Sequence, residues 1–468
     1  MIAAALHLSS CLGWRSVPFG MQGIAPAKDE LLQHAPPSLV LCPLHCESRA
    51  LAKFGKLPVL TIGPGAEAMR AAFANRARWP VPQPRLIVLC GLAGALHSDG
   101  ARGDARSIRT ALSLTAGAPA LTSADRQAHG SIVESPTIAF ARADKLRLHA
   151  SSHADLVDSE SYTFASCAEA AGIPWAIVRG VSDDLTHDLP REVAEFIDAQ
   201  GRTRYLRVLA AVARRPKLAL DLLALGRIAG SALRNAAFAA DALGCLGGID
   251  LCSPSRPLVL YGGSFDPPHM QHAVILRESV RILRAPCAIV MPAAKNPLKR
   301  DAPPATPDAR LALCRANFGN AARDTGAEVR LSTLELNRAG ASYTVDTVID
   351  LIRAHPHLRG AIRVLIGSDA VRDIERWRRW EELLTLATPA IVVRPPDTLA
   401  ATRAFLAEFA QRSGFLDAPN WVLPIDSIAC ASTTARSDLA QGARPDGLAD
   451  AVFDEITARR LYGFGDQR

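Results

Sequence analysis

The stretch LVLYGGSFDPPHMQHA at residues 258–273 carries the strongest pattern in the chain. Its first residues indicate a buried strand that ends in Gly262 and Gly263, and a Pro-containing turn follows. A helix then begins near His269 and carries His272 one turn later. Glycines let a backbone approach a phosphate, and a helix start presents free N–H groups and a positive dipole end. The pattern predicts an anion site with two imidazole donors. The alternative is that His269 and His272 are surface histidines that follow a loop.

The regions on both sides of this stretch alternate apolar runs with Ala-rich helical segments. After it come APCAIVMPA (285–293), AIRVLIGSD (361–369) and TPAIVVRPP (388–396). Before it come LVLC (39–42), PVLTIGPG (58–65), RLIVLCGLAGAL (85–96) and IPWAIVRGVSDD (173–184). This alternation is typical of α/β domains with parallel strands, whose ligands bind at the carboxyl ends of the strands. We predict two tandem α/β domains.

Length and composition agree with more than one domain. The chain has 468 residues, 49% of them hydrophobic, and a net charge of +7, which excludes disorder or a coiled coil as a description of the whole chain. Only 5% of the residues are aromatic, which argues against a single-stranded nucleic-acid platform that stacks bases on rings. The mild positive charge suits anionic small molecules, and no nucleic-acid partner is expected.

The cysteines and the amino terminus predict a cytoplasmic protein. Ten cysteines are spread thinly and form neither a disulfide framework nor a zinc pattern, so we expect reduced thiols. The first residues, MIAAALHLSSCLGW, lack the basic region and cleavage site of a signal peptide. No apolar run approaches the ~20 residues that a spanning helix needs. Residues 1–37 are expected to form a loose extension.

Residues 202–240 form a basic segment with eight Lys or Arg residues against the single acid Asp221. Leucines at helical spacing predict two or three amphipathic helices, broken at Pro216 and loosened near Gly226 and Gly230. These helices either cap the first domain and lead into a linker, or form a basic amphipathic surface that contacts anionic lipid at the membrane periphery. The sequence leaves both interpretations open.

Residues 258–464 resemble the nicotinate-nucleotide adenylyltransferases, a family of HxGH nucleotidyltransferases. The resemblance rests on ordered blocks: GGSFDPPHMQH (262–272), MPAAKNPLK (291–299), DARLAL (308–313), SYTVDT (342–347), LIGSDAVRDIERWRRWEELL (365–384) and ASTTARSDL (431–439). Blocks in this order are far more specific than one motif. The resemblance implies a Rossmann-like fold that joins nicotinate mononucleotide to the adenylyl group of ATP.

The resemblance also implies roles for individual residues. His269 and His272 would hold phosphates and stabilise charge on the α-phosphoryl and leaving groups. The remaining ATP- and phosphate-binding positions would be Gly262, Gly263, Ser264, Phe265, Lys299, with Lys295 as a further cation, and Ser432, Thr433 and Arg436. Mg²⁺ would arrive with ATP, held mainly by the phosphates. The nucleotide, ribose and pyridine would be bound by Thr344, Gly367, Asp369 and Trp377, the last by stacking on the pyridine ring.

One departure bears on this activity. The family has Gly before the second His of the motif, and this chain has Gln271. Glycine lets the helix pack closely on the nucleotide, so the Gln side chain either crowds the adenosine or points away. A nucleotide-binding or regulatory protein whose sites have decayed therefore stays open as an alternative. Nicotinamide mononucleotide as the preferred acceptor stays open for another reason, because the groups that distinguish a carboxylate from an amide are largely backbone.

Residues 38–240 resemble the nucleoside phosphorylase superfamily, especially methylthioadenosine/adenosylhomocysteine nucleosidases and the hopanoid-associated branch. The resemblance rests on LCPLHCESRAL (41–51), TIGPGAEAM (61–69), VLCGLAGAL (88–96) and DSESYTFASCAEAAGIPWAIVRGVSDD (158–184). It implies a phosphorylase-type α/β sandwich that cleaves the N-glycosidic bond of a purine nucleoside.

The same resemblance assigns three acids in this half. Asp183 would protonate the purine, Glu160 would bind ribose hydroxyls, and Glu47 would orient water. Each could instead be a helix cap or a surface carboxylate. Leu92 stands where the family usually has Ser or Thr, and the lost hydroxyl argues against phosphate binding and for hydrolysis.

The expected organisation follows from these patterns. Residues 38–200 form a nucleosidase-like domain, 201–256 a basic helical segment with a linker, and 257–468 a nicotinate-nucleotide adenylyltransferase domain. ATP, nicotinate mononucleotide and a purine nucleoside are the expected small-molecule partners. No dedicated protein metal site is expected.

Overall fold

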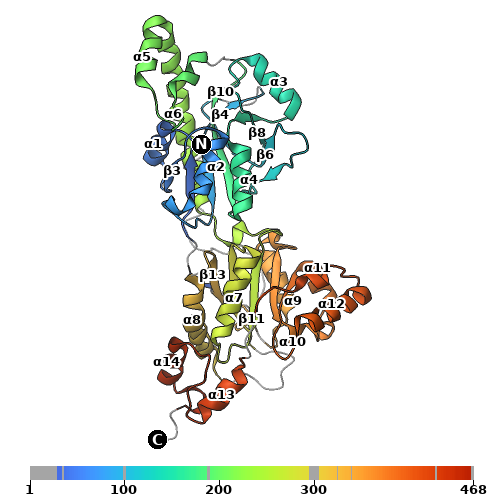
Figure 1. Ribbon diagram of the computed structural model, residues 1–468. Coiled ribbons are helices and arrows are strands. Elements are labelled where there is room, and N and C mark those ends of the chain that lie inside the picture. The colour runs from blue at the N-terminus through green and yellow to red at the C-terminus, as the bar shows by residue number, and fades with distance from the viewer. Residues whose placement is uncertain are drawn as a thin grey trace, which may run out of the picture.

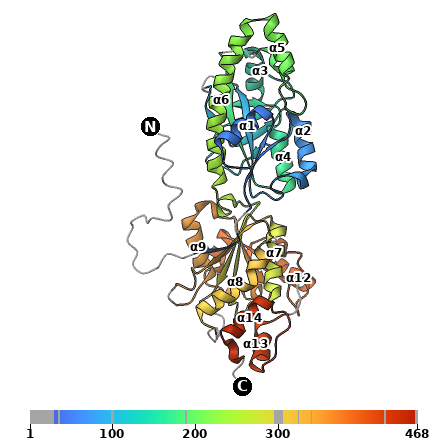
Figure 2. The same ribbon diagram turned by 90° about the vertical axis from the view of Figure 1, so that its left-hand side faces the viewer.

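Two α/β units lie end to end in the computed structural model (Figure 1). The structure describes residues 29–33, 36–97, 102–186, 190–294, 305–323, 325–338, 340–426 and 430–464. Each unit is built on one sheet with helices on both faces, and the turned view in Figure 2 shows both units edge-on.

The carboxyl-terminal sheet is parallel except at one edge. Within the described ranges, its strands in spatial order are β1 (Asp29–Gln33), β13 (Glu328–Ser332), β12 (Cys287–Pro292), β11 (Leu258–Gly263), β14 (Ile362–Gly367) and β15 (Thr388–Val392). The central strands are continuous apolar runs because both faces are covered. β1 pairs antiparallel with β13, so the expectation of a loose extension to residue 37 is wrong for residues 29–33.

Helices cover both faces of this sheet. On one face, α7 (Met270–Leu283) and α8 (Pro307–Arg323) pack in a shared core with β11 and β12. On the other face lie α9 (Thr344–Ala354) and α11 (Trp380–Leu386). The remaining helices of this unit are α10 (Ser368–Val371), α12 (Leu399–Ser413), α13 (Ser432–Ala440) and α14 (Asp450–Ala458).

The amino-terminal sheet is mixed rather than parallel throughout. Its described strands are β2 (Leu39–Cys42), β3 (Val59–Thr61), β4 (Ile87–Ala95), β5 (Ala105–Ile108), β6 (Thr110–Ser113), β7 (Leu121–Thr122), β8 (Ser131–Glu134), β9 (Leu156–Asp158) and β10 (Trp175–Asp183). The predicted runs β2, β3, β4 and β10 pair in parallel. β5, β7 and β9 pair antiparallel with β10, β6 and β4, and their short, half-polar sequences gave no such signal.

The helices of this unit also lie on both faces of its sheet. α2 (Gly65–Ala74) and α4 (Ser161–Ala171) pack on one face, and α1 (His45–Phe54) and part of α6 (Lys217–Gly244) pack on the other. The remaining helices are α3 (Arg142–Ser152) and α5 (Tyr205–Arg214).

The basic segment differs from its expected form. The break at Pro216 separates α5 from α6, but α6 continues through Gly226 and Gly230 without interruption. The second half of α6 packs in the amino-terminal core. Gly180 on β10 permits this contact, because a Cβ there would lie 2.8 Å from the Cβ of Ala232.

Arginines join the two units. Arg256 pairs with Glu169 at 2.9 Å, and Arg284 at the end of α7 donates to the Glu169 carbonyl oxygen at 3.3 Å. Glu169 lies on α4 shortly before β10, and Arg284 lies just before β12. The parallel strands β2, β3, β4 and β10 and those of the carboxyl-terminal sheet therefore begin near this junction and direct their carboxyl ends away from it (Figure 1). Among the described helices, none is long and apolar enough to cross a membrane.

Candidate active sites

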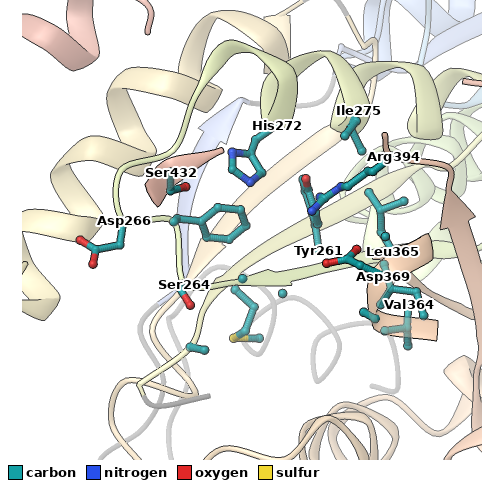
Figure 3. A pocket seen from close by; sticks show the side chains of 18 of the residues that line it. Tyr261, Ser264, Asp266, His272, Ile275, Val364, Leu365, Asp369, Arg394 and Ser432 are labelled. Carbon is teal, nitrogen blue, oxygen red and sulfur yellow. The ribbon is translucent and has the colours of Figure 1, made fainter. Parts of the chain in front are cut away.

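A cavity of about 1320 Å³ lies at the carboxyl ends of β11, β14 and β15. Residues from separate predicted blocks line it together: Gly262, Gly263, Ser264, Phe265, His269, His272, Thr344, Gly367, Asp369, Trp377, Ser432, Thr433 and Arg436. Figure 3 shows how the loop after β11, the start of α7 and the ends of β14 and β15 surround this space. Lys295 and Lys299 lie outside the described residues.

The loop after β11 depends on Gly263. Phe265 adopts a left-handed backbone with φ of 47°, which turns its buried ring back toward the strand. That ring packs edge-on against Tyr261 and Phe318, with centroids 5.4 and 5.3 Å away. A Cβ on Gly263 would lie 2.9 Å from Cζ of Phe265, whereas a Cβ on Gly262 would meet nothing within 4 Å. Gly263 is required for packing, and Gly262 leaves space open for a ligand.

Replacing Gly263 by alanine is expected to lower the free energy of unfolding of the carboxyl-terminal unit by about 1–3 kcal/mol, because the added methyl displaces the Phe265 ring. Gly262→Ala is the matched control and should unfold at the wild-type urea concentration, since its methyl enters open space. Urea unfolding measures both variants. Equal midpoints for the two would contradict the steric role of Gly263.

His269 and His272 stand together at the start of α7. Their rings stack with centroids 3.7 Å apart. The backbone N–H of His269 donates to Nδ1 of His272 at 3.2 Å, which assigns the ring proton of His272 to Nε2. Nδ1 of His269 is buried and has no hydrogen-bond partner among the described residues. Both histidines line the cavity.

Burial, with a smaller contribution from the nearby charge of Arg394, lowers the pKa of His269 to about 4. His269 is therefore a neutral imidazole at neutral pH in the unliganded protein. A bound phosphate would supply the negative charge that favours its protonated form.

The start of α13 holds the loop that precedes α7. Ser432 Oγ donates to the Pro267 carbonyl at 2.9 Å, and Arg436 Nη1 donates to the Asp266 carbonyl at 2.6 Å. The Tyr462 hydroxyl donates to Oδ1 of Asp266 at 2.7 Å. Ser432 and Arg436 thus line the cavity and also fix the loop that presents the histidines.

Two arginines of this site were missed by sequence reasoning. Arg310 on α8 is almost fully buried and donates to the carbonyls of Ser264 and Ala293 at 2.9 and 2.7 Å, so it fixes the loop backbone. Arg394 follows β15, lines the cavity and extends toward Tyr261 beside Asp369 (Figure 3). The string VVRPP, a cation at the carboxyl end of a parallel strand, was an available signal for Arg394.

The recognition side of the cavity is formed by β14, α9 and the segment after α10. Asp369 Oδ1 folds back over Gly367, where a Cβ would lie only 2.2 Å from it, so a side chain at this position would displace the carboxylate. Thr344 begins α9, and Trp377 is half-buried with its indole Nε1 unpartnered within the described structure. These groups place a carboxylate, a hydroxyl and an aromatic ring around one end of the cavity.

In the amino-terminal unit, Glu47 and Glu160 gather around the buried Arg179 of β10. Arg179 Nη2 donates to Oε1 of Glu160 at 2.8 Å and also pairs with Asp158. Glu47 accepts from the backbone N–H groups of Leu44 at 3.0 Å and of Leu92 at 2.9 Å. Burial raises the pKa of Glu47, and burial together with the charge of Asp158 raises the pKa of Glu160 to about 7.

Asp183, at the end of β10, has a different environment. Lys145 on α3 is almost fully buried and pairs with Oδ2 of Asp183, while Ser182 Oγ donates to Oδ1. Lys145 Nζ also donates to the Asp184 carbonyl at 2.7 Å. A cavity of about 510 Å³ adjoins Asp183, and neither Glu47 nor Glu160 lines it. Of the three predicted acids, Glu47 and Glu160 therefore lie in one cluster, and Asp183 forms a separate ion pair. The cations of these two groups, Arg179 and Lys145, were not predicted from the sequence.

The pKa of Glu160 gives the amino-terminal unit a defined pH dependence. The folded protein holds a proton on Glu160 up to about pH 7, whereas the unfolded chain releases it near its ordinary value of 4.5. The free energy of unfolding is therefore expected to fall as pH rises across this window. Urea unfolding should show a shallower pH slope in Glu160→Gln and the wild-type slope in Glu67→Gln, an exposed control on α2. A wild-type slope in Glu160→Gln would contradict the prediction.

Comparisons with known proteins fit this geometry. A cytidylyltransferase-like family model matches residues 260–434, and a phosphorylase superfamily model matches residues 125–214. A probable nicotinate-nucleotide adenylyltransferase of Hahella chejuensis is 38% identical over 146 residues, which are 30% of this chain and 61% of that relative. One from Gemmatimonas aurantiaca is 32% identical over 206 residues, which are 44% of this chain and 92% of the relative. This chain belongs to the nicotinate-nucleotide adenylyltransferase family.

Family membership rests on the carboxyl-terminal half alone. The amino-terminal half resembles the phosphorylase superfamily. Among the solved structures similar to this chain is the apo form of Arabidopsis thaliana 5'-methylthioadenosine nucleosidase. That structure is 15% identical, with a TM-score of 0.33, and the match covers 45% of this chain and 97% of that chain.

Gln271 is this chain's departure from the adenylyltransferase motif. Its side chain is more than nine-tenths buried, lines the cavity, and has an Nε2 without a hydrogen-bond partner in the described part of the chain. It therefore does not point away into solvent. No group of three or more His, Cys, Asp or Glu residues that could hold a metal occurs among the described residues.

Proposed function

We propose that the carboxyl-terminal unit transfers the adenylyl group of MgATP to nicotinate mononucleotide. The phosphate oxygen of the mononucleotide attacks the α-phosphorus, a new P–O bond forms, and the bond to the β-phosphate breaks to release pyrophosphate. The product is nicotinate adenine dinucleotide. The observation that carries the proposal is the stacked pair His269 and His272, which lines the cavity together with Arg394.

The residues support this reaction by alignment and charge stabilisation rather than by a covalent nucleophile. His269, His272 and the N–H groups at the start of α7 would bind the phosphates, with Ser432, Thr433 and Arg436 at the start of α13 as further donors. Arg394 adds a cation that stabilises the leaving pyrophosphate. Asp369 would accept from ribose hydroxyls, and Trp377 would stack on the pyridine ring.

Purified full-length protein supplied with ATP, Mg²⁺ and nicotinate mononucleotide should release pyrophosphate. The same assay with nicotinamide mononucleotide tests the alternative acceptor, for which we expect a lower kcat/KM. Nucleotide binding by calorimetry without any turnover would favour a binding or regulatory module instead, with Gln271 as the first residue to revert to glycine.

For the amino-terminal unit, we propose cleavage of the N-glycosidic bond of a purine nucleoside. The similarity to the phosphorylase superfamily supports this proposal, and so does the buried cluster of Glu47, Glu160 and Arg179. Glu160 would bind ribose hydroxyls and Glu47 would orient the attacking water. The loss of a hydroxyl at Leu92 favours water over phosphate as the nucleophile.

The ion pair of Asp183 bears on how the purine leaves. Lys145 donates to the carboxylate, so the pair contains one transferable proton. We infer that this proton passes to the purine as its bond to ribose breaks, and that the attacking water returns a proton to the pair. Release of adenine from methylthioadenosine, followed by absorbance, tests the activity. Lys145→Met and Asp183→Asn should both abolish it, whereas Arg147→Met on the exposed face of α3 should retain it.

We also propose that the protein works in the cytoplasm. The cysteines that the structure describes are all free, as expected for a reducing compartment.

A further inference from the structure

The outer surface of α5 and of the first turns of α6 is apolar. Large side chains there are between 63% and 83% exposed: Tyr205, Leu206, Leu209, Leu220 and Leu223. They make up five of the thirteen large hydrophobic residues exposed in the described structure, although they lie within only nineteen residues of sequence. We call these five residues the outer apolar face.

The outer apolar face is not part of a core. No residue of α5 is buried, and both views show α5 at the end of the molecule farthest from the carboxyl-terminal unit (Figures 1 and 2). Only the second half of α6 packs on the sheet. Exposed leucines at this density mark an interaction surface rather than scattered surface residues.

Cations surround this face. Arg204, Arg207, Arg214, Arg215, Lys217 and Arg227 are all exposed. The acids near them are fewer: Arg207 pairs with Glu195 at 3.7 Å, Arg215 pairs with Glu192 at 3.2 Å, Asp198 lies near Arg204, and Asp221 lies on α6. Six cations against four carboxylates leave the surface positive.

We propose that the hairpin of α5 and α6 binds the surface of an anionic phospholipid bilayer. Apolar side chains enter the boundary between headgroups and acyl chains, while arginines beside them contact lipid phosphates. The charge favours this occupant over a second copy of the chain, because two copies joined through this face would bring the same cations together. The hairpin lies on the membrane and does not cross it.

Flotation of the intact protein with vesicles tests the proposal. We expect it to float with phosphatidylcholine vesicles that contain about one third phosphatidylglycerol, and not with phosphatidylcholine alone. Leu206→Asp combined with Leu209→Asp should lower the bound fraction at least about tenfold, because the variant loses two apolar contacts and adds two negative charges that the anionic lipids repel. Arg214→Glu combined with Lys217→Glu should lower it in the same way.

Leu416→Asp is the matched control, because Leu416 is 78% exposed on the carboxyl-terminal unit and should leave binding unchanged. Amide hydrogen exchange along β10 at the wild-type rate would show that the α5 and α6 variants keep the fold of the amino-terminal unit, and unchanged pyrophosphate release would show the same for Leu416→Asp in the carboxyl-terminal unit. Wild-type protein that does not float with anionic vesicles would overturn the proposal. Unchanged vesicle binding by the double Asp variant would also overturn it. A wild-type dimer that the double Asp variant converts to a monomer, without vesicle binding by either, would identify a second copy as the occupant.

Discussion

His269→Ala is expected to lower the kcat of adenylyl transfer by about 10²–10³-fold, the usual cost of losing one donor that stabilises transition-state charge. The physical reason is the position of the ring. It is buried at the start of α7, stacked on His272, with an Nδ1 that no described group satisfies. In the proposed reaction this ring would stabilise charge on the attacking phosphate and on the leaving pyrophosphate. Steady-state release of pyrophosphate measures the effect.

The neighbouring Met270→Ala is the matched control. Met270 is half-exposed on the same turn and does not line the cavity, so its loss should leave kcat within about twofold of wild type. A His269→Ala enzyme that keeps the wild-type kcat and loses only affinity for ATP would assign this histidine to ground-state binding instead.

Arg179→Met is expected to lower the free energy of unfolding of the amino-terminal unit by about 3–5 kcal/mol at neutral pH, because it leaves buried carboxylates without their cation. Arg179 is fully buried in β10, pairs with Asp158 and Glu160, and lies close to Glu47. The loss should shrink as the pH falls and Glu160 takes up a proton. Urea unfolding, with amide hydrogen exchange along β10 to identify the unit, measures both effects.

An exposed arginine of the same unit gives the contrast. Arg147 is 73% exposed and pairs with Asp144 one turn away, so Arg147→Met should change stability by less than about 1 kcal/mol. Adding Glu160→Gln to Arg179→Met should restore part of the loss. Equal unfolding midpoints for the two arginine variants would show that the buried cluster does not depend on its cation.

The sequence predicted the parts of the fold that depend on residues close together along the chain. Continuous apolar runs located β4, β10, β11 and β12, because strands covered on both faces need no polar residues. The end of a strand at Gly263 and the start of a helix beside His269 were predicted from the glycines, the prolines and the apolar run around them.

Features that depend on residues far apart in the sequence could not be predicted. β1 pairs with β13 about three hundred residues later, and five residues of mixed polarity give no sign of that partner. Arg310, Arg179 and Lys145 are single cations whose carbonyl or carboxylate partners come from other elements, so only the fold identifies them as buried. Gly226 and Gly230 weaken a helix by propensity, yet they lie within a continuous α6 whose later turns are packed on the sheet.

The junction at Glu169 has a consequence for how two activities on one chain would cooperate. Since β10 and the parallel strands of the carboxyl-terminal sheet start near it, their carboxyl ends face opposite directions, and the Asp183 pocket and the His269 cavity lie at opposite ends of the molecule (Figure 1). A metabolite released at one pole would have to diffuse through bulk solvent along the length of the molecule to reach the other. Covalent fusion would then fix the two catalysts at equal copy number, without any channelling of an intermediate between them.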